Sequence, residues 1–280
     1  MIDAHLHLWQ PTPGRYAWLE RADPTLRRPF TAAQAHRELA EAGLDAAILV
    51  QAEDSQADTE AMLATAAANP WLVGVVGWVP LDDTNLARRI LERWLRYPAF
   101  CGVRHLVHDD PRDDFLQLPA VRRSLMLLAE HGIAFDVPDA WPRHLSAVVD
   151  LAAALPGLTI VLDHLGKPPI GSTEFSAWQR TIMAVAAHPN TVAKVSGLHR
   201  AGQQYGVEEL RPVWDLALEL FGPTRLMYGG DWPMTVPGGG YARALAPIQR
   251  LSAELSGAER HALFHGTAVR SYSIPETSDV

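Results

Sequence analysis

Apolar residues fall into short runs that recur along the whole 280-residue chain. Several of these runs are apolar without interruption, which is typical of parallel strands covered on both faces. We expect eight strands, at residues 2–7, 46–51, 72–79, 102–106, 133–137, 159–164, 192–196 and 226–230.

The segments between these runs carry signals for helices. Segment 31–42 begins with Thr31, a good N-cap residue, and is followed by Gly43, a common stop after the last turn. Segment 118–131 ends at Gly132 in the same way. Further helices are expected at 58–68, 86–96, 144–155, 177–187, 207–221 and 241–251.

A strand followed by a helix, repeated about eight times, predicts an α/β fold of the closed (β/α)8 TIM-barrel type. An open doubly wound sheet would usually show a glycine-rich phosphate turn after its first strand, whereas here the first strand runs into His5-Leu6-His7-Leu8-Trp9. We expect one domain over 1–280, with a loop at 233–240 over one barrel face and a loose terminus at 275–280.

Charge and cysteine content narrow the class of protein. The 24 basic and 32 acidic residues give a net charge of -8, which disfavours nucleic acid and anionic membranes as partners. The single cysteine, Cys101, excludes an intrachain disulfide framework and a cysteine-built zinc site. No basic leader and no segment of ~20 apolar residues is present, so we expect a cytoplasmic enzyme with a small-molecule substrate.

Four polar residues lie in or just after expected strands, at positions that would bring them to the same end of the barrel. His5 and His7 are two residues apart, so both imidazoles point to the same side of an extended chain. His164 and Asp231 each follow an apolar strand. Because the carboxyl ends of barrel strands form the active face, these four side chains are expected to converge.

Three neutral imidazoles and a carboxylate suit one divalent metal ion, zinc in the first instance, with a position open for water. Asp231 would accept the proton of that water as a general base. The same residues can also act without metal, with His164 and the other histidines donating hydrogen bonds to the developing oxyanion. Both mechanisms remain open at this point.

Further residues at or near strand ends are candidates for substrate contact: Trp9, Gln51, Trp78, Arg104, His105, Lys194 and Trp232. A guanidinium can anchor a carboxylate or a hydroxyl, and indole rings can stack on a sugar. A lysine within an apolar strand has to be paired or face the site. The structural alternatives are an ion pair for Arg104, plain packing for the tryptophans and a solvent-facing position for Gln51.

Other polar residues receive structural interpretations first. His108 and His199 can reach the pocket from their loops, but loop histidines are usually solvated, and we expect the solvated position for both. We expect Lys167 to close a loop or touch substrate, and Asp136 to be a weaker candidate for binding hydroxyls. Ser196 is a poor nucleophile candidate because no histidine is expected near it. The acidic cluster Asp109, Asp110, Asp113 and Asp114 is expected to be a solvated loop.

Several ordered motifs resemble a known family, the metal-dependent hydrolases called amidohydrolase 2. They are Asp3–Trp9 with Tyr16–Leu19, Gly102–His105, Leu162–Pro168, Lys194–Leu198 and Gly230–Pro233. The likeness runs from Met1 to about Tyr272 and is nearest to the branch of L-fucono-1,5-lactonase and related sugar lactonases. It implies a barrel in which His5, His7 and His164 hold a divalent metal, usually zinc, or polarise a carbonyl, while Asp231 activates water.

The resemblance also has limits. Segment 133–137 offers no bridging lysine, so a two-metal centre is not expected, and some similar lactonases work without metal. The hypothesis is hydrolysis of a sugar-acid lactone. The alternatives are a metal-dependent decarboxylase with similar histidines and aspartate, and a noncatalytic sugar-binding barrel; oligomeric state is not predicted.

Overall fold

Eight parallel strands form one sheet that closes on itself. The computed structural model describes residues 1–200 and 203–275. The strand order is β1-β2-β3-β4-β5-β6-β7-β10. The strands are β1 (Ile2–Leu6), β2 (Ala46–Val50), β3 (Leu72–Gly77), β4 (Phe100–Arg104), β5 (Ala134–Val137), β6 (Ile160–Leu162), β7 (Thr191–Val195) and β10 (Leu226–Tyr228).

The barrel closes where the last strand meets the first. The backbone N–H of Asp231 donates to the carbonyl of His5 at 2.8 Å, and that of His7 donates to the carbonyl of Trp232 at 2.8 Å. Leu6 and Trp232 form a parallel bridge beyond β10. The segments that close the barrel are therefore the same segments that carry the candidate histidines and aspartate.

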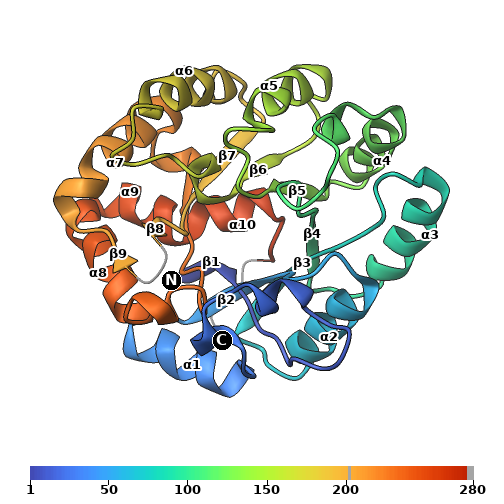
Figure 1. Ribbon diagram of the computed structural model, residues 1–280, viewed down its shortest axis with the longest axis horizontal. Helices are drawn as coiled ribbons and strands as arrows, with labels where there is room; N and C mark the ends of the chain where they lie inside the picture. Colours follow the sequence, from blue (N-terminus) through green and yellow to red (C-terminus); the bar gives the residue numbers. More distant parts are fainter. Residues whose placement is uncertain (201–202, 276–280) are drawn as a thin grey trace.

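Helices α1 to α8 surround the strands as an outer ring, while the C-terminal α10 crosses behind the strands in the middle of the view (Figure 1). The helices are α1 (Ala32–Glu41), α2 (Gln56–Ala67), α3 (Thr84–Trp94), α4 (Pro119–Glu130), α5 (Leu145–Ala154), α6 (Phe175–Ala186), α7 (Val207–Phe221), α8 (Tyr241–Ser252), α9 (Gly257–His261) and α10 (Thr267–Ser271). Thr31 and Gln34 form a capping box at the start of α1. The (β/α)8 fold is confirmed, and each predicted strand and helix agrees with the observed one within two residues at either end.

Five short elements, two strands and three helical segments, were not predicted. The loop after β7 contains a two-stranded hairpin, β8 (His199–Arg200) with β9 (Gln203–Gln204). After α8 the chain forms α9, a π-helical turn at Ala262–Gly266, and α10. Elements of two to five residues are too short to show a hydrophobic period, so the pattern along the chain could not indicate them.

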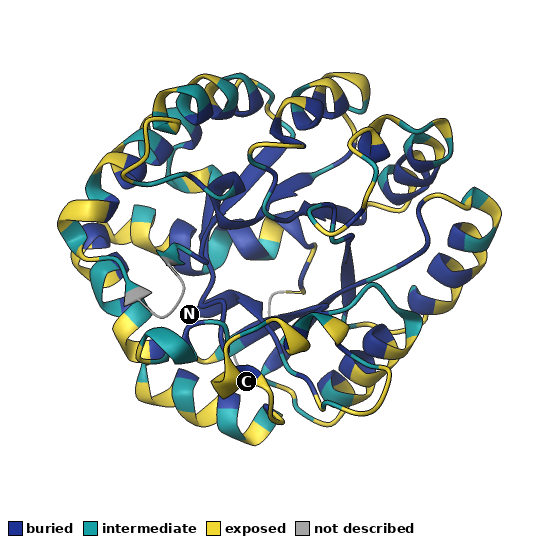
Figure 2. Cartoon of the chain, in the orientation of Figure 1, coloured by how far each residue is buried: buried dark blue, intermediate teal, exposed yellow. Residues whose placement is uncertain are grey.

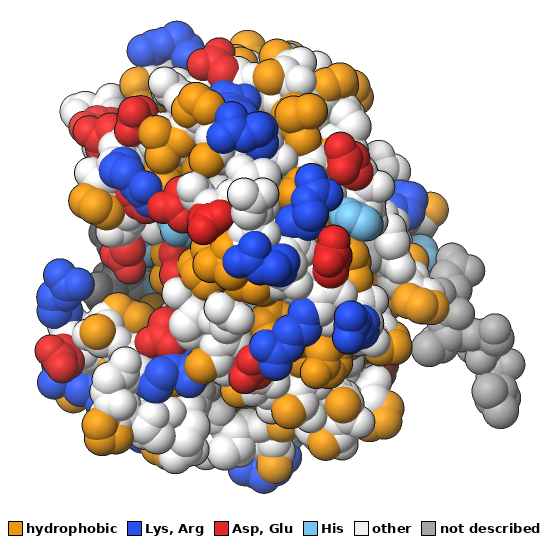
Figure 3. Space-filling model, turned by 90° about the vertical axis from the view of Figure 1, so that its right-hand side faces the viewer, with side chains coloured by type: hydrophobic (Ala, Val, Ile, Leu, Met, Phe, Trp, Pro, Cys, Tyr) orange, Lys and Arg blue, Asp and Glu red, His pale blue; other side chains and the backbone are white. Residues whose placement is uncertain are grey.

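Apolar side chains form two layers of core. The larger cluster fills the space between strands and helices, where the inward helix faces are buried (Figure 2). The smaller cluster lies inside the barrel and includes Ile48, Val76, Ala134 and Met227, together with Tyr272 just after α10. Among the described residues, no helix is both long and apolar enough to cross a membrane. Figure 3 shows acidic and basic side chains interspersed on one side of the molecule.

Candidate active site

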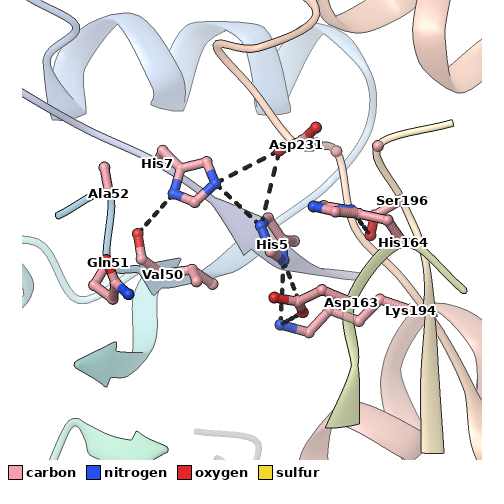
Figure 4. A network of polar contacts seen from close by, with 12 residues as sticks. His5, His7, Val50, Gln51, Ala52, Asp163, His164, Lys194, Ser196 and Asp231 are labelled. Atoms are coloured by element: carbon pink, nitrogen blue, oxygen red, sulfur yellow. Dashed lines mark hydrogen bonds and ion pairs between the residues drawn. The ribbon is translucent and has the colours of Figure 1, made fainter. Parts of the chain in front are cut away.

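His5, His7 and Asp231 meet at the carboxyl end of the barrel (Figure 4). The Nε2 atoms of the two histidines are 3.0 Å apart. Oδ1 of Asp231 lies 3.8 Å from Nε2 of His5 and 3.5 Å from Nε2 of His7. Among the described residues, this is the one group of three such side chains whose donor atoms all lie within 4.8 Å of one another.

The spacing and chemistry of this group fit a divalent metal ion. Ligands about 2.0–2.1 Å from a tetrahedral zinc lie roughly 3.3 Å apart, which is near the observed separations. Nδ1 of His7 contacts the carbonyl of Val50 at 2.8 Å, and a carbonyl can only accept, so Nδ1 carries the proton and Nε2 presents a lone pair. A cation or a shared proton has to lie between two ring nitrogens this close.

Burial keeps the imidazoles of His5 and His164 neutral. It lowers the pKa of His5 well below the usual value, although the charge of Asp163 acts in the opposite direction. Burial likewise lowers the pKa of His164 to about 4, opposed by Asp231 and Asp139. Neutral imidazole is the form that binds metal ions and that can donate one hydrogen bond while accepting another.

The turn after β10 gives Asp231 its position. Its backbone has φ +50, and Gly229 and Gly230 precede it. A Cβ at Gly230 would come within 2.3 Å of the Tyr241 ring and 2.5 Å of Oδ2 of Asp3. Asp3 accepts from the Gly230 N–H at 2.7 Å and from the Tyr241 hydroxyl at 2.8 Å. Asp3, to which we had assigned no role, thus anchors the turn that carries Asp231.

Asp231 is buried yet ionised. Burial raises the pKa of its carboxyl, but His164, His199 and His7 outweigh burial and hold the pKa well below the usual range. Its Oδ2 lies 3.2 Å from Nε2 of His199. His199 was expected to be a solvated loop residue, and that expectation was wrong, because the β8–β9 hairpin folds it over the rim.

His164 lies beside this group but outside it. It stands in a 3-10 turn, Asp163–Gly166, where its own backbone has φ 56. Its ring is 4.6 Å from that of His5, centroid to centroid, and its Nδ1 is 2.8 Å from Oγ of Ser196. The expectation that Ser196 has no histidine nearby was therefore wrong. A Cβ at Gly197 would come within 2.3 Å of His164 Nδ1, so the histidine packs directly on this glycine.

A layer of buried charges lies one step below the histidines. Lys194 Nζ is 2.6 Å from Oδ2 of Asp136 and 3.0 Å from Oδ1 of Asp163. Asp163 is also 3.3 Å from Nδ1 of His5 and 3.1 Å from Arg104. Strand side chains alternate, so Lys194 faces inward with Val192 below it and Ser196 above it. The ammonium supports His5 from beneath and does not line the cavity.

Arg104 reaches the cavity, but its guanidinium is largely committed. It donates to Asp163 at 3.1 Å and to the carbonyl of Gln51 at 2.8 Å. A cavity of about 260 Å³ opens above these residues, just below the size range typical of small-molecule sites. Its walls are His7, Trp9, Trp18, Ala52, Arg104, Leu106, His108, Asp109, Pro138, Asp139, His164, Lys167, His199, Asp231 and Met234.

Lys194 and four more of the predicted substrate residues, Gln51, Trp78, His105 and Trp232, do not lie among these walls. Side chains alternate along a strand, and each of the latter four residues comes directly after a residue that faces the interior or the cavity, or lies beyond the strand end. Its side chain therefore contacts other parts of the protein and not the cavity. Gln51 donates to Asp54 at 2.9 Å, and the indole N–H of Trp78 lies 3.3 Å from Nδ1 of His105. His105 stacks on Phe115 at 4.0 Å, and Trp232 packs against Phe30 at 5.2 Å.

Part of the acidic loop after β4 is structural. Asp110, expected to be solvated, is buried and binds His105 at 3.3 Å and Arg112 at 2.7 Å. Asp109 and His108 line the cavity. Loop residues of this kind carry no periodic signal, so the sequence could show their charge but not their direction.

A parallel barrel with a His-x-His pair and an aspartate at its carboxyl rim defines a class of (β/α)8 hydrolases. The family model described as amidohydrolase matches residues 2–274. The chain belongs to the amidohydrolase family, and the resemblance inferred from the motifs is confirmed.

Relatives and solved structures agree with this assignment. An L-fucono-1,5-lactonase of Burkholderia ambifaria is 33% identical over 282 residues, covering 99% of this chain and 97% of the relative. One of Burkholderia multivorans is 31% identical, again covering 99% and 97%. A crystal structure of an amidohydrolase from Burkholderia multivorans with bound Zn has 31% identity and a TM-score of 0.89, covering 98% of this chain and 99% of that one.

Proposed function

We propose that this enzyme hydrolyses a sugar-acid lactone, of the kind that L-fucono-1,5-lactone represents. Two relatives at 31–33% identity carry the name L-fucono-1,5-lactonase. The observation that carries most weight is the charge of the cavity wall. Three carboxylates line it, Asp109, Asp139 and Asp231, and its one arginine is already paired with Asp163.

Away from the group that would hold a metal ion, two carboxylates, Asp109 and Asp139, stand against one lysine, and this balance favours a neutral, hydroxylated substrate. A dicarboxylate lactone or an aromatic acid would meet like charge from the carboxylates and would need cationic partners. Lys167 is the one lysine of the wall, and it lies 3.8 Å from Asp139. Trp9 and Trp18 add flat apolar surfaces on which a sugar ring can stack.

The proposed chemistry uses residues of the rim. Asp231 takes a proton from water as the water oxygen attacks the lactone carbonyl carbon, and His199 supports the carboxylate through Oδ2. His164 donates a hydrogen bond to the oxygen that gains negative charge. The ring C–O bond then breaks, and the proton passes to the leaving oxygen, which becomes an alcohol. The product is a hydroxy acid, which releases one proton to solution.

His5, His7 and Asp231 are the residues that would hold a metal ion, and we propose zinc. When bound, a divalent ion supplies a Lewis acid for the carbonyl and lowers the pKa of water. His164 was also predicted as a ligand, but it lies outside the 4.8 Å group, so we assign it to the substrate.

The test is a panel of lactones followed by acid release, with carbon dioxide measured in parallel on hydroxybenzoates. We expect acid release with aldono-1,5-lactones and a fall of roughly 10²–10⁴-fold in kcat for Asp231→Asn. Asp215→Asn, an exposed carboxylate on α7, is the control. Carbon dioxide without acid release would support the decarboxylase instead. Ligand-induced stabilisation without any turnover would support a binding protein.

A further inference from the structure

The far wall of the cavity carries a carboxylate and an ammonium group that the hydrolytic steps above do not use. Asp139 follows β5, and Lys167 follows β6. In the closed strand order β5 lies four places from β1 and three from β10, so Asp139 lies across the mouth from His5 and His7, with Lys167 beside it. A lactone bound with its carbonyl at Asp231 would direct its more distant carbons toward Asp139 and Lys167.

Asp139 is held in an unusual state. Its backbone has φ +42, which costs energy in a residue with a side chain. Its Oδ1 is buried and makes no hydrogen bond within the described residues. Burial raises the pKa of this carboxyl, but Lys167, His164 and His108 outweigh burial and hold the pKa below its usual value. An ionised oxygen without a hydrogen bond is costly to bury unless a ligand completes it.

Lys167 is placed as the complement. Its Nζ lies 3.8 Å from Oδ1 of Asp139, beyond hydrogen-bond range, and donates to the carbonyl of Gly197 at 3.3 Å. Both side chains are about one-third exposed, at 38% and 32%, and both line the cavity. An ammonium retains further donors after one hydrogen bond, so it can bind a ligand oxygen as well.

We propose that Asp139 and Lys167 together bind two neighbouring hydroxyl groups of the substrate and so determine specificity for hydroxylated lactones. One hydroxyl donates to Oδ1 of Asp139, and the other accepts from Nζ of Lys167. This inference rests on the proposed function, since it says which residues bind the part of the lactone that is remote from the carbonyl. A plain ion pair is the competing explanation.

The first test compares an aldono-1,5-lactone with δ-valerolactone, which has the same ring and no hydroxyls. A hydrogen bond to a charged group is worth roughly tenfold to a hundredfold. We expect Asp139→Asn and Lys167→Met to lower kcat/KM for the sugar lactone by that factor, mainly through KM, and to leave δ-valerolactone unchanged. Asp113→Asn, an exposed carboxylate of a neighbouring loop, is the matched control. Equal losses on both lactones, or none, would overturn the inference.

The second test separates this inference from the hydrolase proposal. An aldono-1,5-lactam keeps the ring and hydroxyls but resists hydrolysis, and its binding can be measured by calorimetry. We expect wild-type protein to bind it and both variants to bind it at least tenfold more weakly. If the lactam binds in this way while no lactone is hydrolysed, the proposed function fails and the hydroxyl site stands. If the variants bind it as wild type does, or wild type does not bind it, the hydroxyl site is refuted.

Discussion

Single residues at this site work through contacts that span the chain. His5 meets Asp163 and Lys194 beneath it, and Asp231 is held by a turn that Asp3 anchors. The charged layer around Lys194 is fully buried, and such a layer persists only when each charge has partners. Removing one member leaves the others uncompensated.

Lys194→Met should therefore destabilise the protein strongly. The substitution leaves Asp136 and Asp163 facing each other in the barrel interior without their shared cation. We expect a loss of about 3–5 kcal/mol in the free energy of unfolding, measured by urea titration. Arg211→Met, which removes an exposed ion pair with Glu254, serves as the comparison and should change the midpoint little. A Lys194→Met midpoint equal to wild type would refute the structural role.

Gly197→Ala should displace His164. The added Cβ would come within 2.3 Å of His164 Nδ1, and the backbone at φ +56 disfavours a side chain. We expect a loss of more than about 1–2 kcal/mol in stability, together with a lower kcat. Gly132→Ala shares the positive φ, at +66, but has open space around it. That control should lose stability alone, and a normal kcat for Gly197→Ala would contradict the packing argument.

At the scale of elements, the C-terminal segment closes the barrel interior. Tyr272, next to α10, packs in the inner apolar cluster, and its hydroxyl donates to Oδ2 of Asp136 at 2.7 Å. The last short helix is thus coupled to the charged layer that supports His5. The eight longer helices and the strands position the residues of the rim. The C-terminal segment holds the charged layer beneath them in place.

Tyr272→Phe tests the coupling between the C-terminal segment and the charged layer by removing one oxygen atom. It keeps the ring in the apolar cluster but removes the donor to a buried carboxylate. We expect a loss of about 1–3 kcal/mol in the free energy of unfolding, from chemical denaturation. Tyr97→Phe, on an exposed ring, should be neutral. If the two variants unfold alike, the hydroxyl contributes nothing to the barrel interior.

At the scale of the whole molecule, a bound metal ion would contribute to the stability of the folded protein. The two facing ring nitrogens of His5 and His7 and Oδ1 of Asp231 form a group that a cation would hold together. A ligand that binds only the folded state raises the unfolding temperature, and the effect grows with the ratio of its free concentration to its dissociation constant. The stability of the whole barrel should therefore report on this one site.

We expect the purified protein to contain about one divalent ion per chain, measured by mass spectrometry of the metal. Its removal by a chelator should lower the unfolding temperature by roughly 5–10 °C, and zinc should restore it. Asp231→Asn should abolish most of this response. Full stability and full lactone turnover after chelation would instead favour the metal-independent mechanism.

The sequence by itself determined the fold and three of the side chains that meet at the rim. Strand and helix periods are local properties, so the eight strand–helix units could be predicted within two residues. The carboxyl ends of all barrel strands lie at the same rim, so residues at those ends are expected to lie near one another. His5, His7 and Asp231 followed from that rule. Only the tertiary structure decided which neighbours point into the cavity, because a side chain next to a strand end can turn either way. Trp232 and His105 turned outward, whereas His199 and Asp139, on loops without any period, turned in.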